Sequence, residues 1–157
     1  MSNALLTYLD DHLAGSAHAL ELLEWMKKEH HGSPLGDFFT QLCSEVSRDR
    51  ETLRNLARGL GSDGDRVKEA VAWTSEKINR LKLHDDGTRP LGTFEALEFL
   101  VLGIHGKGAL WRALHCVCAD DPRLQAFDFE ELESRASKQE AEVESLRIAF
   151  ARKAFIG

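Results

Sequence analysis

The chain has 157 residues, 43% of them hydrophobic and 29% charged, with a formal net charge of −6. This size and balance are typical of one soluble domain, residues 1–157, that buries its core without disulfides or metals as supports. The acidic charge argues against nucleic-acid binding, because phosphate recognition relies on clustered lysine and arginine. No apolar run approaches the roughly 18 residues of a bilayer span, and no signal-peptide pattern is present. We therefore expect a cytoplasmic protein without membrane or nucleic-acid partners.

The first two long helices are predicted over about Ala4–His30 and Pro34–Leu60. Apolar residues recur in both at alternating spacings of three and four, which places them on one side of a helix. Ser33 followed by Pro34 is typical of an N-cap and the first helical residue. Because only a few residues link the two helices, they are expected to be antiparallel neighbours.

A shorter helix is predicted next, from about Ser62 to Leu83, as a connector lying along the bundle. The polar stretch His84–Gly92 contains two glycines and a proline and is predicted to be a loop. Thr93 is then the expected N-cap of the third long helix, Phe94–Cys118.

The fourth long helix is predicted over Phe129–Phe155, after a break at Asp120–Pro122. Asp128 and Glu131, three residues apart, form a capping-box signal for its start. Short links join the first helix to the second and the third to the fourth, whereas a long connection joins the second to the third. The fold class predicted is therefore all-α: an antiparallel four-helix bundle of two helical hairpins, with a long crossover that contains a short fifth helix.

Each long helix has one polar residue at the centre of its apolar seam: Ser16, Asp49, Lys107 and Gln139. Helices of similar length packed side by side would bring these four residues to roughly one level. An unpaired ammonium in an apolar interior would lose its proton or draw in water, so Lys107 requires a partner. We expect an Asp49–Lys107 ion pair, with hydrogen bonds from Ser16 and Gln139.

The segments "LLTYLDDHLAGSAHALELL" and "LRNLARGLG" resemble the small bacterial ferritin-like stress-protein family, and the predicted helix connectivity resembles the ferritin-like superfamily. This resemblance implies a stress-related role and a di-metal site made by one carboxylate from each of two helices and Glu-x-x-His from each of the others. Among the four central residues only Asp49 is a carboxylate, and Lys107 brings a positive charge to the place of a ligand. We therefore expect no metal cofactor. The alternative is a ferroxidase or oxidase that binds iron or manganese through atypical ligands.

The central polar layer has two further interpretations. It can fix the register of the helices without any ligand, as single polar seam residues do in coiled coils. Alternatively, it can line a pocket for a small anionic or carbonyl ligand near Lys107. Gly103, Gly106 and Gly108 surround this lysine in the helix interior, where each glycine costs up to about 1 kcal/mol relative to alanine. They indicate either close approach of the first and third long helices or a cavity.

The leading hypothesis from the sequence is a non-catalytic bundle with a structural, stress-related or partner-binding role. A desolvated lysine can act as a Schiff-base nucleophile, but a neighbouring Asp49 would hold Lys107 protonated, which argues against an enzyme. A homodimer is expected, because Leu5, Leu22 and Met26 form a second apolar face on the first helix.

Overall fold

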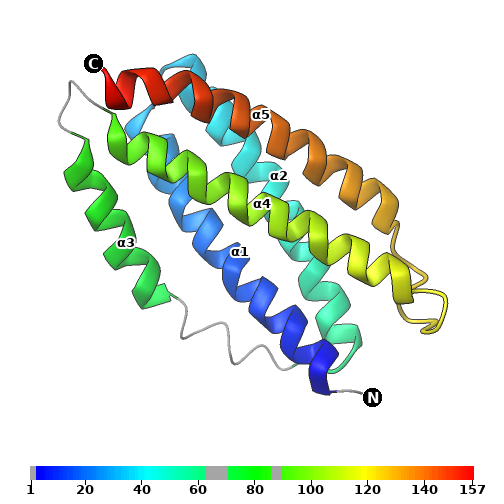
Figure 1. Cartoon of the computed structure of the whole chain (residues 1–157). Helices are drawn as coiled ribbons and strands as arrows, with labels where there is room; N and C mark the ends of the chain where they lie inside the picture. The colour runs from blue at the N-terminus through cyan, green and yellow to red at the C-terminus, as the bar shows by residue number, and fades with distance from the viewer. Residues whose placement is uncertain (1–2, 63–70, 86–89) are drawn as a thin grey trace.

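A computed structural model of the chain describes residues 3–62, 71–85 and 90–157, and five α-helices make up its regular structure (Figure 1). They are α1 (Asn3–Glu29), α2 (Pro34–Gly59), α3 (Val71–His84), α4 (Leu91–Val117) and α5 (Phe129–Phe155). The prediction of an all-α protein is confirmed for these ranges. The predicted start of the crossover helix, after Ser62, lies outside the described residues. No helix within the described ranges has both the length and the apolar character needed to cross a membrane.

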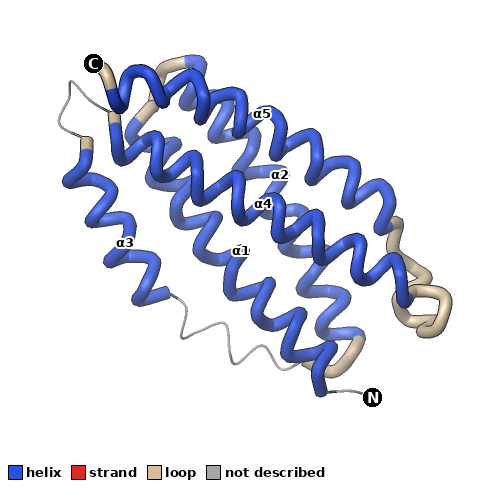
Figure 2. The backbone as a smooth tube through the Cα atoms, viewed as in Figure 1, coloured by secondary structure: helices blue, strands red, loops and turns tan. Residues whose placement is uncertain are grey.

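The helices lie side by side as two hairpins and one additional helix (Figure 1). Antiparallel α1 and α2 form the first hairpin, and antiparallel α4 and α5 form the second. Helix α3 packs along α1 and α4, so that the chain returns to the end of the bundle where α2 begins. As a result, α2 and α4 run in the same direction. In Figure 2 the long helices continue from one end of the bundle to the other, and the described loops and turns lie at its ends.

Two of the three predicted helix caps are present, and one is wrong. The Ser33 side chain accepts a hydrogen bond from the backbone N–H of Gly36, and Asp128 Oδ1 accepts one from the N–H of Glu131. Thr93, by contrast, does not cap the third long helix, because α4 already begins at Leu91. Its N–H and hydroxyl both donate to the carboxylate of Asp85, a residue that follows α3. The carboxylate of Asp85, which precedes the loop, therefore accepts a hydrogen bond from a backbone N–H in the first turn of α4.

The apolar seams of the helices meet in one core. Its largest fully buried apolar side chains are Leu9, Leu23, Met26, Phe39, Leu56, Leu97, Leu100, Leu110, Trp111, Leu114 and Leu124. The apolar face of α1 predicted to make a homodimer is part of this interior: Met26 and Leu22 are 0% and 6% exposed, and Leu5 packs against the core. Helix α3 covers Leu22 with Ile78 and Leu81. These three residues of α1 therefore do not offer a surface to a second copy of the chain.

Candidate functional site

The centre of the bundle holds a hydrogen-bonded network built around Lys107. From α4, its Nζ donates to Asp49 Oδ2 on α2 at 2.6 Å and to Gln139 Oε1 on α5. Asp49 and Gln139 are only 2% and 1% exposed, and the lysine side chain is 15% exposed. Each residue occurs at the polar interruption of an apolar seam, so the packing of the seams carries it to the interior. The structure thus brings together three of the four central residues.

Two more charged residues complete the network. Gln139 Nε2 donates to Glu45 Oε2 at 2.8 Å, one helical turn before Asp49 on α2. Arg135, one turn before Gln139 on α5, places Nη2 3.3 Å from Asp49 Oδ1. Lys107 and Arg135 therefore balance Asp49 and Glu45, and the network has no net formal charge. It connects α2 to the hairpin of α4 and α5.

The position of Lys107 in the interior changes its acid–base behaviour. Burial lowers the pKa of its ammonium from the ordinary value of 10.5, the charge and hydrogen bond of Asp49 oppose this shift, and nearby Arg135 adds to it. Asp49 thus compensates part of the desolvation cost that the ammonium suffers. The pair belongs to the costly class of buried ions, in which the loss of one partner leaves the other charge without compensation.

Ser16 does not belong to this network, contrary to the expectation of a layer with one residue from each long helix. Its hydroxyl donates to the backbone carbonyl of Leu13 at 2.6 Å and accepts from Arg50 Nε at 3.0 Å. A serine inside a helix readily bonds to the preceding turn, and its side chain is too short to cross a wide gap between helices. Helix α1 therefore contributes no residue to the hydrogen bonds of Lys107.

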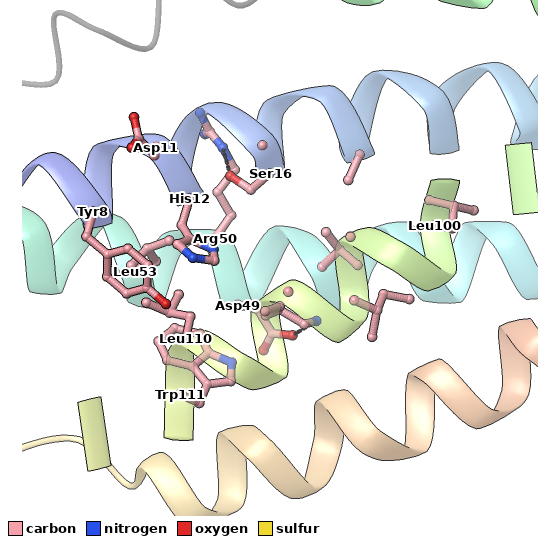
Figure 3. Close-up of a pocket in the computed structure, with 17 residues that line it drawn as sticks. Tyr8, Asp11, His12, Ser16, Asp49, Arg50, Leu53, Leu100, Leu110 and Trp111 are labelled. Atoms are coloured by element: carbon pink, nitrogen blue, oxygen red, sulfur yellow. Dashed lines mark hydrogen bonds and ion pairs between the residues drawn. The ribbon is translucent and has the colours of Figure 1, made fainter. Parts of the chain in front are cut away.

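A pocket of about 390 Å³ separates α1 from the network. It lies between α1, α2 and α4 (Figure 3), and its volume falls in the range usual for small-molecule sites. Asp49 and Lys107 form part of its inner wall, and Ser16 lies on the opposite wall. Its apolar lining consists of Ala19, Val46, Leu53, Leu100, Ile104, Leu110 and Trp111. The pocket is thus largely apolar, with charged groups at one side.

Glycines keep this pocket open. A Cβ atom added to Gly15, Gly103 or Gly106 would have no atom from another part of the fold within 4 Å, and all three residues line the pocket. Close approach of α1 and α4 is therefore not seen at these glycines, and the pocket beside them is open to solvent, since Gly15 and Gly103 are exposed and Gly106 is half-buried. Gly108 differs, because its Cβ would lie 3.7 Å from Ala136 Cβ on α5. This glycine faces the partner helix of its own hairpin.

Two aromatic residues of α1 form the outer part of the pocket wall. The rings of Tyr8 and His12 meet edge to face with their centroids 4.7 Å apart, and both line the pocket (Figure 3). Burial lowers the pKa of His12 below its ordinary value of 6.5, and the charge of Asp11 only partly opposes the shift. His12 is therefore a neutral imidazole near neutral pH.

Two buried polar atoms of the inner wall have no hydrogen-bond partner among the described residues. They are the indole nitrogen of Trp111, which is 1% exposed, and Asp49 Oδ1, whose contact with Arg135 does not have hydrogen-bond geometry. In Figure 3 the indole nitrogen of Trp111 is on the side of its ring that faces Asp49. A buried donor without a partner is costly, whereas the charge of Asp49 Oδ1 is offset by Arg135 at 3.3 Å.

Sequence reasoning missed Glu45, Arg135 and Trp111 as site residues. Glu45 precedes Asp49 by four residues and Arg135 precedes Gln139 by four, a spacing that puts each pair on one helix face. This spacing was a usable signal for the extended network. For Trp111 there was no such signal, because a tryptophan on an apolar seam is as consistent with plain packing.

The residues at the bundle centre do not fit a di-iron or di-manganese site. The ammonium of Lys107 lies 2.6 Å from a carboxylate oxygen of Asp49, where a second metal ligand would be needed. Across the described residues there is no group of three or more His, Cys, Asp or Glu side chains suited to hold a metal ion. Hard metal ions need several oxygen or imidazole ligands around one point.

The chain matches no protein-family model, no curated protein and no solved structure. The functional argument therefore comes from the geometry of the network and the pocket.

Proposed function

We propose that this protein is a non-catalytic, ferritin-like helical bundle that binds a small, mainly apolar molecule in the pocket between α1, α2 and α4. The observation that carries this proposal is the 390 Å³ pocket, whose inner wall contains the buried and unpartnered indole nitrogen of Trp111. If close packing alone determined the residues at these positions, we would expect larger side chains that fill the space between the helices. Here the lining has glycine at Gly15, Gly103 and Gly106 instead.

The ligand in this proposal carries a hydroxyl group at one end. Trp111 Nε1 is a donor that lacks an acceptor, and Asp49 Oδ1 is an acceptor that lacks a hydrogen-bond donor. A hydroxyl oxygen accepts from the first, and its proton is donated to the second. A carboxylate would instead add a second anion beside Asp49, while Lys107 already donates to Asp49 and Gln139. A neutral ligand therefore suits this wall better than the anionic ligand that was one of the alternatives from the sequence.

The proposed class of protein follows from the connectivity and from the charge balance. Two antiparallel hairpins joined through α3 have the helix order of ferritin-like bundles, and this order is compatible with the resemblance seen in the sequence. In place of ligands for two metal ions, the centre carries a pair of cations and a pair of anions. The ammonium of Lys107, paired with the carboxylate of Asp49, has no lone pair for nucleophilic attack, and we propose binding without a chemical step.

Quenching of Trp111 fluorescence by a heavy-atom alcohol tests this function. A variant that keeps only Trp111, with Trp25→Phe and Trp73→Phe, is titrated with 2,2,2-tribromoethanol, in which the bromine atoms are next to the hydroxyl. We expect saturable quenching at low alcohol concentration, because the hydroxyl would hold the bromine atoms against the indole ring. Decan-1-ol should compete and restore the fluorescence.

The matched control keeps only Trp25, with Trp73→Phe and Trp111→Phe. Trp25 is also buried, at 7% exposure, but it does not line this pocket. Its fluorescence should decrease only linearly with tribromoethanol, as for random collisions. Equal quenching of the two variants, or no saturation with Trp111, would contradict a ligand site at this place.

A further inference from the structure

A second hollow adjoins the ligand pocket. It has a volume of about 100 Å³ and lies between α1, α3 and α4, next to Leu22 and Ile78. The two hollows share four lining residues: Gly15, Ala19, Leu100 and Gly103. Three of these four have no side chain or only a methyl group. The hollows therefore adjoin at these four residues of α1 and α4, called the neck below, where Gly15 and Gly103 are exposed to solvent.

We propose that the two hollows form one channel, and that the ligand is a linear, long-chain alcohol. This inference rests on the proposed binding function and adds the shape of the ligand. The hydroxyl lies at Trp111 and Asp49, and the hydrocarbon chain passes between Gly15 and Gly103 to end beneath α3. A single unbranched chain would follow both hollows past the neck.

The residues beyond the neck suit the end of a hydrocarbon chain. Leu22, Ile78 and Leu81 are 6%, 9% and 3% exposed and bound the second hollow from α1 and α3. On α4 it is lined by Phe99, which is 36% exposed and has the ammonium of Lys77 over its ring at 3.7 Å from the centroid, and His18 of α1 lines it as well. Trp111, with its unpartnered Nε1, and Asp49 line the first hollow and not the second. The hydroxyl end of the chain is therefore placed at Trp111 and Asp49.

The length of the channel sets the length of the ligand. Trp111 lines the first hollow and Phe99 the second, and at 1.5 Å per residue they lie about 18 Å apart along α4. An extended chain advances roughly 1.2 Å per bond, as the fully extended polypeptide does. About 14 carbon atoms therefore reach from the indole to the far end.

Calorimetric titration with straight-chain alcohols from hexan-1-ol to octadecan-1-ol tests this inference on the whole chain. For the native sequence we expect affinity to rise by up to about fourfold per methylene group, the factor for a fully buried methylene. The rise should stop near 14 carbon atoms, where the channel ends. Tetradecane, which lacks the hydroxyl, should bind more weakly than tetradecan-1-ol.

Blocking the neck separates the channel from the pocket. The variant Gly103→Leu places a side chain in open space, so the fold tolerates it, and Gly59→Leu serves as a control at another helical glycine with open space that lines neither hollow. In Gly103→Leu the affinity for tetradecan-1-ol should fall at least tenfold more than the affinity for hexan-1-ol, because Gly103 lines both hollows and only the long alcohol also loses its contacts in the second. Gly59→Leu should change neither.

Three outcomes would overturn the inference. If short and long alcohols bind the native chain equally, the ligand does not extend past the neck, although the pocket itself stays a binding site. If Gly103→Leu and Gly59→Leu behave alike, the neck is not on the path of the chain. If no alcohol binds and tribromoethanol does not quench Trp111, both the channel and the proposed function are wrong.

Discussion

The two sides of α4 are built differently. Toward α5 and α2 the helix is packed: a Cβ atom at Gly108 would be in van der Waals contact with Ala136 of α5, and Lys107 is hydrogen-bonded to Asp49 and Gln139. Toward α1, Gly103 and Gly106 face open space. The same residue type therefore permits contact on one side and maintains a cavity on the other.

This difference shows how a bundle can combine stability with an open site. The closed side contains the buried charges, which are stable only with partners held in fixed positions. On the open side, glycines leave space where side chains could pack, and each methylene group not buried there forgoes about 0.8 kcal/mol of stabilisation. Single substitutions can test the two sides separately, because Gly103 and Gly106 occupy different positions of α4 from Lys107.

The largest effect is expected from Asp49→Ala on the closed side. The substitution leaves Lys107 and Arg135 as buried cations without their shared carboxylate. We expect the free energy of unfolding, measured by urea denaturation, to fall by about 3–5 kcal/mol.

A double-mutant cycle tests whether this loss comes from the pair. Lys107→Met alone should cost less than Asp49→Ala, since Arg135 still neutralises Asp49. The double variant should be more stable than the sum of the single losses predicts, by about 0.5–3 kcal/mol. Simple additivity would mean that the two side chains do not interact.

A smaller loss is expected when the contact between α4 and α5 is overfilled. In Gly108→Leu the added side chain meets Ala136 of α5, because a Cβ atom at this position is already 3.7 Å from its methyl group. Overpacking of this kind costs about 1–3 kcal/mol. Thermal unfolding should show a lower midpoint; an unchanged or higher midpoint would indicate that the closed side is not tightly packed.

On the open side, the opposite sign is expected. Gly103→Ala and Gly106→Ala remove the entropic cost of glycine in a helix and introduce no clash. Each should raise the free energy of unfolding by up to about 1 kcal/mol in urea titrations. Destabilisation by either alanine would show that α1 lies too close to α4 to leave room for the added methyl group.

The smallest effect concerns pH and His12 on the pocket wall. Burial lowers the pKa of His12 in the folded protein, so the unfolded chain takes up a proton first as the pH falls below its ordinary value of 6.5. Stability is therefore lost as pH falls from about 6.5 toward the lower folded pKa. The variant His12→Gln should show a weaker dependence of the unfolding free energy on pH in this range, and an unchanged dependence would place the effect at other groups.

The sequence was sufficient to predict the central contacts of the closed side, although not Glu45 and Arg135, because the seam pattern is local. Apolar residues at spacings of three and four define each seam, and a polar residue in a seam must find a partner. This reasoning predicted the contacts of Lys107 with Asp49 and Gln139. It failed for Ser16, whose hydroxyl has a nearby acceptor in its own helix, the carbonyl of Leu13.

The open side could not be predicted in the same way. Glycines in a helix are equally compatible with close approach and with a cavity, and the distance between α1 and α4 decides between them. That distance depends on how α3 packs along both helices, a property of the whole fold. The cap of α4 shows the same limit, since Asp85 precedes the loop and takes the role that the local sequence assigned to Thr93.

A crystal structure of the protein with 14-bromotetradecan-1-ol tests the central claim most directly, because anomalous scattering locates the bromine atom. We predict a bromine peak between Ile78 and Phe99, continuous density through the neck at Gly103, and a hydroxyl beside Trp111. Protein side chains filling the space between α1 and α4, with no bromine peak in the interior, would contradict the claim.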